Sequence, residues 1–180
     1  MTVSPYKEYN PELWMLGTSG GSAALAGHLG YHLSLGLFVA PTGQKYDIVE
    51  CYINAFNEAG HEYKPKVMIA VGGYCADTDE EARYIASSQL YKKTIQQTRG
   101  QSSQWIHPEI AMDESKKFSD RENRFYSLLS DSFVIGSQET CKSKLEKASE
   151  YWKTDEFAIL TVTHDFESRV KSYELLADIQ

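Results

Sequence analysis

The sequence predicts an α/β protein with a parallel sheet of four strands and flanking helices. Four short runs are rich in β-favouring residues and almost continuously apolar, as expected for strands covered on both faces: 13–17, 33–39, 67–71 and 157–162. Segments with helical spacing separate or follow them. Alternating strands and helices imply right-handed crossovers, and four such units are half of a TIM (β/α)8-type barrel.

The helical segments begin and end at recognisable residues. Residues 22–28 are small and rich in alanine, and Gly30 provides a stop. Residues 46–59 repeat apolar side chains at helical spacing and end before Gly60. Three further helices are expected to start at polar capping residues, which are Thr78, Ser137 and Asp165.

A polar insert of about residues 100–132 is too long for a plain connection. We expect it to be a partly helical excursion, and a lid is one interpretation of it. The chain has 180 residues, which suits one domain, so residues 1–180 are expected to form a single unit.

The composition excludes several classes of protein. The net charge is −7, which disfavours nucleic acid as a partner. The three cysteines are widely spaced and form no C-x-x-C pair, so reduced thiols are expected, with neither a disulfide framework nor a metal site. Residues 1–10 lack the apolar core of a signal peptide, and no run approaches 18 apolar residues. We therefore expect a cytoplasmic protein without a membrane partner.

The most informative segment reads WMLGTSGGSAALAG and begins at residue 14. An apolar strand there runs into a turn that opens directly into a helix. The hydroxyls of Thr18, Ser19 and Ser22 and the backbone N–H groups of Gly20 and Gly21 gather at the helix N-terminus, where the helix dipole favours an anion. Two interpretations stay open: a phosphate cradle, or a serine-capped helix after a glycine turn.

Other candidate residues have simpler explanations. His164 follows the last strand and could act as an acid or base or contact a ligand ring, although it could merely belong to a helix cap. His28 and His32 are four residues apart, but Gly30 between them breaks the helix, so they are not expected to bind zinc. We expect both histidines at the surface or at its boundary with the core. Cys75 precedes a helix start, where a thiolate could be stabilised, but nothing else there indicates redox chemistry.

Four segments in this order resemble the bacterial luciferase-like flavin monooxygenases: 11–41, 75–83, 133–146 and 155–177. Together they cover nearly the whole chain beyond residue 10. Members of that family are FMN-dependent (β/α)8 barrels and considerably longer than this chain. The sequence resembles only their C-terminal half, from roughly the fifth strand onward.

The resemblance implies a cofactor site. In the family, the residues that match Thr18, Ser19 and Ser22 surround the FMN phosphate, and Gly20 and Gly21 match the same backbone loop. The family's N-terminal half supplies part of the flavin pocket, much of the substrate pocket and the histidine associated with oxygen chemistry. Those positions have no counterpart in this sequence, so no catalytic residue is assigned.

The expected function is therefore that of an FMN-dependent luciferase-like monooxygenase whose site is completed by another chain. A free-standing half-barrel leaves both edge strands unpaired. A homo-oligomer, most simply a homodimer, or a separate N-terminal-half chain would cover them. The alternatives are a non-catalytic flavin-binding or structural homo-oligomer, and a truncated relic without activity.

Overall fold

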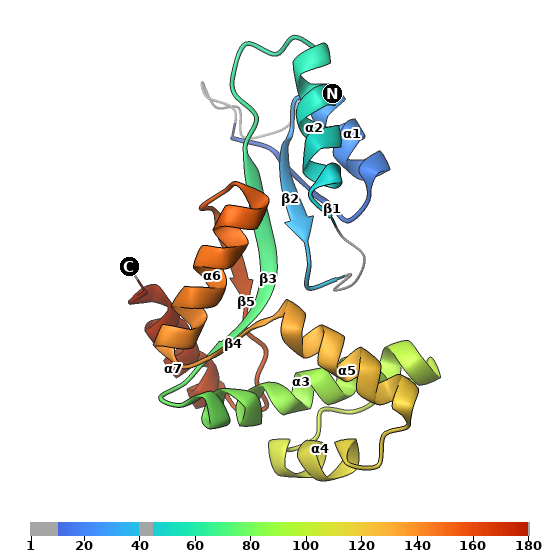
Figure 1. Cartoon of the computed structure of the whole chain (residues 1–180), viewed down its shortest axis with the longest axis vertical. Coiled ribbons are helices and arrows are strands. Elements are labelled where there is room, and N and C mark those ends of the chain that lie inside the picture. Colours follow the sequence, from blue (N-terminus) through green and yellow to red (C-terminus); the bar gives the residue numbers. More distant parts are fainter. Residues whose placement is uncertain (1–10, 40–44, 180) are drawn as a thin grey trace, which may run out of the picture.

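The computed structural model of the chain describes residues 11–39 and 45–179. Parallel strands and helices alternate along this part of the chain (Figure 1). In chain order they are β1 (Trp14–Gly17), α1 (Gly20–Leu29), β2 (His32–Gly36), α2 (Asp47–Glu58), β3 (Val67–Cys75), α3 (Asp79–Arg99), α4 (Pro108–Ser115), α5 (Asp120–Ser132), β4 (Val134–Gly136), α6 (Gln138–Trp152), β5 (Phe157–Leu160) and α7 (Phe166–Ala177). Within these residues, no helix is long and apolar enough to cross a membrane.

The strands β1, β2 and β3 form one parallel ladder. Trp14 pairs with His32 at the start of the first two strands, and Leu33 pairs with Val67 at the start of β3. Every residue of β2 is buried, because strands lie on both of its edges and helices cover it. The predicted parallel α/β architecture is confirmed.

The longest strand, β3, pairs with three others. Its first residues pair with β2, Ile69 to Gly72 pair with β5, and Gly73 to Cys75 pair with β4. The prediction of four strands is therefore wrong in number, since the described sheet has five. The missed strand, β4, has only three residues, which is too short for an apolar run to stand out from its surroundings.

In the part of the chain that the structure describes, the sheet does not close into a barrel. Within the described residues β1 pairs only with β2, and β5 pairs only with β3. Leu16 on β1 is 53% exposed and Leu160 on β5 is 39% exposed. Since β4 also pairs only with β3 among the described residues, the molecule has the architecture of a partial barrel with open edges at β1, β4 and β5, and unpaired backbone groups on such edges can accept a further strand.

The helices α1 and α2 pack against each other beside β1 and β2 (Figure 1). Gly27 lies at their closest approach: a Cβ atom there would be 2.7 Å from both the Phe56 backbone nitrogen and the Tyr52 carbonyl oxygen. Gly30 ends α1 in the left-handed conformation, with φ of 73°, as predicted. Buried Tyr52 and Phe56 join this helix pair to the sheet.

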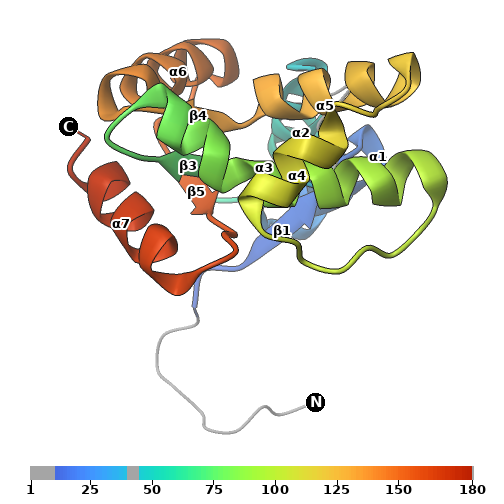
Figure 2. The same cartoon turned by 90° about the horizontal axis from the view of Figure 1, so that it is seen from below.

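The predicted insert is largely helical, which confirms the expected excursion. Its two helices, α4 and α5, lie along α3 (Figure 2). Arg99 at the end of α3 donates from its Nε to the Glu122 carboxylate at 2.6 Å, and this bond ties α3 to the start of α5. Leu129 on α5 is fully buried in the core beside β3. A lid function for the insert stays a prediction.

The C-terminal helices α6 and α7 pack beside β3 and its neighbours (Figure 1). The Ser172 hydroxyl accepts a hydrogen bond from the Cys75 backbone N–H at 2.9 Å, and the Thr161 hydroxyl donates to the Gly73 carbonyl oxygen at 2.7 Å. These bonds attach the end of the chain to the last residues of β3. All three predicted capping residues are confirmed: Thr78, Ser137 and Asp165.

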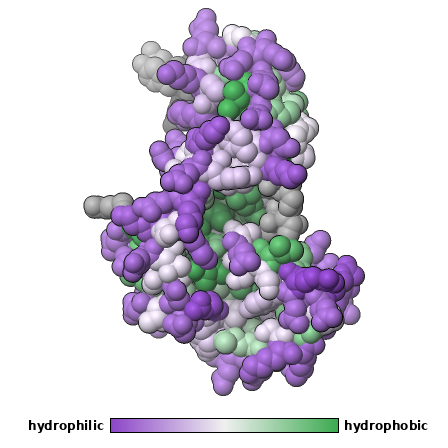
Figure 3. All heavy atoms as spheres, in the orientation of Figure 1, coloured by the Kyte–Doolittle hydropathy of each residue, from purple (hydrophilic) through white to green (hydrophobic). Residues whose placement is uncertain are grey.

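An apolar hollow lies where β3 continues beyond β2. A partly open cavity of about 330 Å³ lies there between β3, α6 and the segment that joins α5 to β4. Leu37, Val71 and Phe133 are among its apolar walls. Apolar side chains are visible in a hollow at the middle of the molecule (Figure 3). The open sheet therefore leaves part of its apolar interior uncovered.

Candidate functional site

The turn between β1 and α1 presents a helix N-terminus at the carboxyl end of β1. Ser19 is the N-cap of α1, and its hydroxyl accepts a hydrogen bond from the Ser22 backbone N–H at 3.3 Å. The Ser22 hydroxyl accepts from the Ser19 N–H at 3.2 Å and donates to the Ser19 carbonyl oxygen at 2.9 Å. The predicted serine-capped helix is confirmed, in the form of a reciprocal capping box.

Two backbone donors of the turn remain available. Gly20 and Gly21 are the first residues of α1, and their N–H groups have no hydrogen-bond partner among the described residues. A Cβ atom on Gly20 would meet nothing closer than the Cys51 Sγ at 3.9 Å, and one on Gly21 nothing closer than the Ser19 Oγ at 4.0 Å. Open space beside free N–H donors is the environment that an oxyanion needs.

No side chain in the first turn of α1 compensates the partial positive charge at the N-terminus of this helix. The first turn of α1 contains no acidic residue, whereas each of the other six helices in the described part of the chain has at least one there. A carboxylate in the first turn normally stabilises the positive end of the helix dipole. An anion from outside would stabilise α1 in the same way.

Gly17 and Thr18 form the floor of the turn. Gly17 is buried, and a Cβ atom there would lie 2.6 Å from the Ser22 Oγ, so a larger residue would displace the capping hydroxyl. Thr18 is half-buried, and its methyl group lies close to Gly36 at the end of β2. Its hydroxyl forms no hydrogen bond with the described residues. The predicted site residues Thr18 to Ser22 thus lie in one compact turn, and anion binding there stays a prediction.

A lysine also lies at the carboxyl end of the strands, and its position there was not predicted from the sequence. Lys93, on α3, is half-buried and donates from its Nζ to the Phe38 carbonyl oxygen at 2.8 Å, just beyond β2. Burial lowers the pKa of the Lys93 ammonium. A lysine in a long polar helix gives no sign in the sequence that it points inward, so no local signal could have identified it.

His164 lies beyond the carboxyl end of β5, at the expected rim, next to a histidine of the insert. The rings of His107 and His164 are 5.1 Å apart with an interplanar angle of 73°, and the Tyr84 ring is 6.3 Å from His107. The cap of α7 is formed by the Asp165 carboxylate, which accepts from the Ser168 N–H at 2.7 Å. The proximity of His107 could not be foreseen, because it depends on how the insert folds back.

The thiols and the remaining histidine pair do not form a second site. The three cysteines are free, and burial raises the pKa of Cys75 and raises that of Cys141 to about 12, so neither is an activated thiolate. His28 is exposed, as expected. His32 is not at the surface: it begins the fully buried strand β2 and is only 5% exposed.

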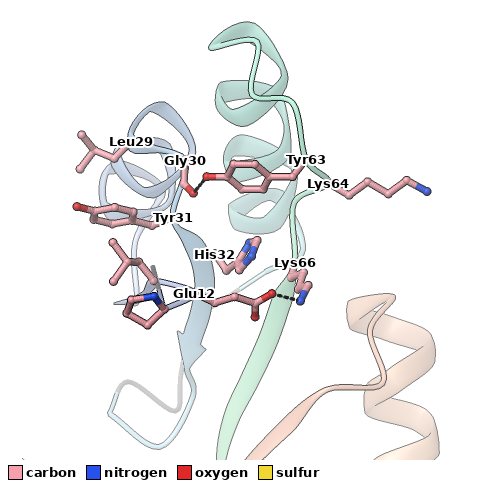
Figure 4. Close-up of a pocket in the computed structure, with 10 residues that line it drawn as sticks. Glu12, Leu29, Gly30, Tyr31, His32, Tyr63, Lys64 and Lys66 are labelled. Carbon is pink, nitrogen blue, oxygen red and sulfur yellow. Dashed lines mark hydrogen bonds and ion pairs between the residues drawn. The ribbon is translucent and has the colours of Figure 1, made fainter. Parts of the chain in front are cut away.

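A second concave region lies at the amino ends of the strands. A cavity of about 510 Å³ is lined there by residues that precede β1, the turn after α1 and the segment that leads into β3 (Figure 4). The His32 ring lies between Tyr63 and an ion pair of Lys66 with Glu12 (Figure 4). The contributing segments are far apart in sequence, so this cavity carried no sequence signal.

The amino-acid sequence matches the model of the luciferase-like monooxygenases over residues 1–154. The chain belongs to the luciferase-like monooxygenase family. Among relatives of this luciferase-like chain, the uncharacterized protein YvbT of Bacillus subtilis (strain 168) is 30% identical over 167 residues, which are 93% of this chain and 48% of that protein.

Solved structures share the fold of the luciferase-like chain. The crystal structure of apo-MsnO8 has a TM-score of 0.83 and 25% identity, covering 99% of this chain and 53% of that one. A second similar structure is that of the oxygenating constituent of 3,6-diketocamphane monooxygenase from Pseudomonas putida, a type II Baeyer-Villiger monooxygenase in complex with FMN. Its TM-score is 0.64 and its identity 21%, and the match covers 93% of this chain and 48% of that one. The luciferase-like chain therefore spans about half the length of the proteins it matches.

Proposed function

We propose that the turn of residues 18–22 binds the phosphate of FMN, so that this chain supplies one half of an FMN-dependent monooxygenase site. The free N–H groups of Gly20 and Gly21, at a helix N-terminus without an acidic first turn, carry this proposal. Membership of the luciferase-like monooxygenases supports it. The FMN complex of the structurally similar Pseudomonas putida monooxygenase supports the choice of cofactor.

The residues of the turn fit a phosphate group. The Thr18 hydroxyl is not engaged with any described residue, and the hydroxyls of Ser19 and Ser22 can rotate from their mutual cap to an oxyanion. The glycines add donors without bulk. When bound, FMN supplies the redox chemistry of oxygenation, while these residues bind and orient its phosphate.

A partner would complete the site. The chain spans about half the length of its relatives, and Leu16 and Leu160 are exposed on the open edge strands β1 and β5. A second copy of this chain, or a separate chain equivalent to the relatives' other half, would pair with these edges. The free thiols support a reducing compartment such as the cytoplasm for this assembly.

A matched pair of variants tests the phosphate site. Ser22 is the third residue of α1 and Ser168 is the third residue of α7, so Ser22→Asp and Ser168→Asp place a carboxylate at equivalent helix positions. Both changes favour the helix dipole and should leave the fold intact. FMN is titrated and its fluorescence followed. Ser22→Asp should weaken FMN binding at least about tenfold by charge repulsion, and Ser168→Asp should not.

Riboflavin, which lacks the phosphate, provides a further control. Its affinity should be lower than that of FMN and should be the same for the wild type and Ser22→Asp. Equal affinity of the wild type for FMN and riboflavin would contradict the assignment of the phosphate to this turn. Undiminished FMN binding by Ser22→Asp would contradict it as well.

The open edges also favour a second candidate function, that of a structural homo-oligomer without catalysis. Sedimentation of the wild type should then show a stable dimer that binds no FMN. Leu16→Lys, on the open edge of β1, should shift the dimer towards monomer. Leu25→Lys on α1, where the leucine is 51% exposed, is the matched control. A monomeric wild type would exclude this function.

A further inference from the structure

The cavity at the amino ends of β1 and β2 has the size and shape of a small-molecule site. Its volume of about 510 Å³ falls in the range of roughly 300–1,000 Å³ typical of ligand pockets. Its walls include Pro11, Leu13 and Leu29, together with polar groups from the segment before β3. It lies at the opposite end of β1 from residues 18–22, so its occupancy is independent of the proposed flavin site.

His32 supplies a buried polar group that lacks a partner. The residue is 5% exposed, and its Nδ1 has no hydrogen-bond partner among the described residues. The ring packs between Trp14 and Tyr63, at centroid distances of 5.0 Å and 5.8 Å. Burial lowers the pKa of His32, so the neutral ring offers one donor and one acceptor. A buried polar group without a partner is costly, so a ligand group that reached this nitrogen would gain a hydrogen bond there.

A cation borders the same cavity. The Lys66 Nζ lies 2.5 Å from the Glu12 carboxylate, and both side chains are about half exposed. The hydrogen bond that Lys66 donates to Glu12 raises the pKa of Lys66, which keeps its ammonium charged. Tyr63 is held in place because its hydroxyl donates to the Gly30 carbonyl oxygen. Lys64 also belongs to the lining, but its side chain points away from the other lining residues, so Lys66 is the cation that borders the cavity (Figure 4).

We propose that this cavity binds a small aromatic carboxylate. The flat ring would lie against the apolar wall beside Leu29 and the Tyr63 ring. Its carboxylate would reach the Lys66 ammonium, and His32 would provide a hydrogen bond at the inner end (Figure 4). An anionic group is proposed because the half-exposed Lys66 ammonium borders the cavity and can donate to a second carboxylate, and aromatic bodies are favoured because the wall combines aromatic rings with leucine side chains.

The first measurement compares 2-naphthoate with its neutral analogue 2-naphthamide by calorimetric titration of the wild-type chain. We expect saturable binding of one naphthoate per chain and roughly 10- to 100-fold weaker binding of the amide, since a hydrogen bond to a charged group is lost. The imidazole NMR signals of His32, assigned with a His32→Gln variant, should move during the naphthoate titration. Those of the exposed His28 should not.

Variants locate the carboxylate. Lys66→Met should weaken naphthoate binding by the same 10- to 100-fold and leave the amide unchanged. Lys171→Met is the matched control, because Lys171 is as exposed as Lys66 and is also paired with a carboxylate, but at the other end of β3. The double variant Glu12→Gln/Lys66→Met shows whether repulsion by Glu12 accounts for the loss, in which case binding would recover fully.

Three outcomes would overturn the proposal: no saturable naphthoate binding, equal affinities for naphthoate and naphthamide, or an equal loss of affinity in Lys66→Met and Lys171→Met. Full recovery in the double variant would also overturn it, because Lys66 would then contribute nothing of its own. Failure of FMN to bind would not bear on any of these results.

Discussion

Replacing Gly27 with alanine should destabilise the protein, although alanine is the better helix former. The added Cβ atom would lie 2.7 Å from two backbone atoms of α2 and 2.8 Å from the Ala55 Cβ. Backbone atoms cannot move aside alone, so α1 and α2 would have to separate. Overpacking of this kind costs about 1–3 kcal/mol, and we expect the upper half of that range. The gain in helix propensity offsets about 1 kcal/mol.

The net loss is therefore about 1–2 kcal/mol, which lowers the melting temperature by about 2–8 °C for a chain of this size. Circular dichroism during urea and thermal unfolding measures it. Gly21→Ala is the control, since it makes the same change in the exposed first turn of the same helix, where the nearest atom is 4.0 Å away. A Gly27→Ala protein as stable as the wild type, with the same denaturant slope, would refute the reasoning.

Leu129→Ala should lower the free energy of unfolding by about 2–5 kcal/mol because the side chain is fully buried. Leu128→Ala, at a 53% exposed position, should change it by less than about 0.5 kcal/mol. Urea unfolding of the two variants measures the difference. The pKa of Glu122 is lowered to about 2, chiefly by its arginine partner, so its carboxylate stabilises the fold above pH 4.5 and this contribution is lost as the pH falls towards 2. Melts between pH 7 and pH 2 should show a shallower acid decline for Glu122→Gln; an identical decline would contradict this. A thiol reagent at pH 8 should label only Cys51 in the folded protein and all three cysteines after unfolding; rapid labelling of a second thiol would show that the buried pair is accessible.

Local patterns predicted most of the elements, and contacts between distant residues account for the differences. The apolar runs and capping residues located four strands and their helices, because each signal lies within a few residues. The predicted strand that corresponds to β3 ended at residue 71, because the apolar run on which it was based stops there. In the structure Gly72 and Gly73 continue the strand. Cβ atoms there would lie 2.7 Å from the Phe133 ring and 2.4 Å from the Ile159 Cγ2, so these glycines admit neighbours from much later in the chain.

In the candidate site, too, local patterns could be predicted from the sequence and contacts between distant residues could not. The turn of residues 18–22 could be found in the sequence because its hydroxyls and glycines are consecutive and cap one helix. Lys93 and His107 could not, because their positions depend on how α3 and the insert pack. The cavity beside His32 was also invisible, since its ion pair joins residues 54 positions apart. The charge and burial of Lys93, His107 and the cavity beside His32 depend on tertiary contacts, which no local sequence pattern reveals.

The pairing of β3 with late strands has a consequence for synthesis on the ribosome. Thr161 contacts the strand at Gly73, 88 residues earlier in the chain. At roughly 5–20 residues per second, one edge of β3 would wait roughly 4–18 s for its neighbour to emerge. An apolar strand with an unsatisfied edge is open to aggregation during that interval. The nascent chain should therefore depend on holding chaperones more than its modest length suggests, and slower translation between codons 76 and 157 should reduce its yield.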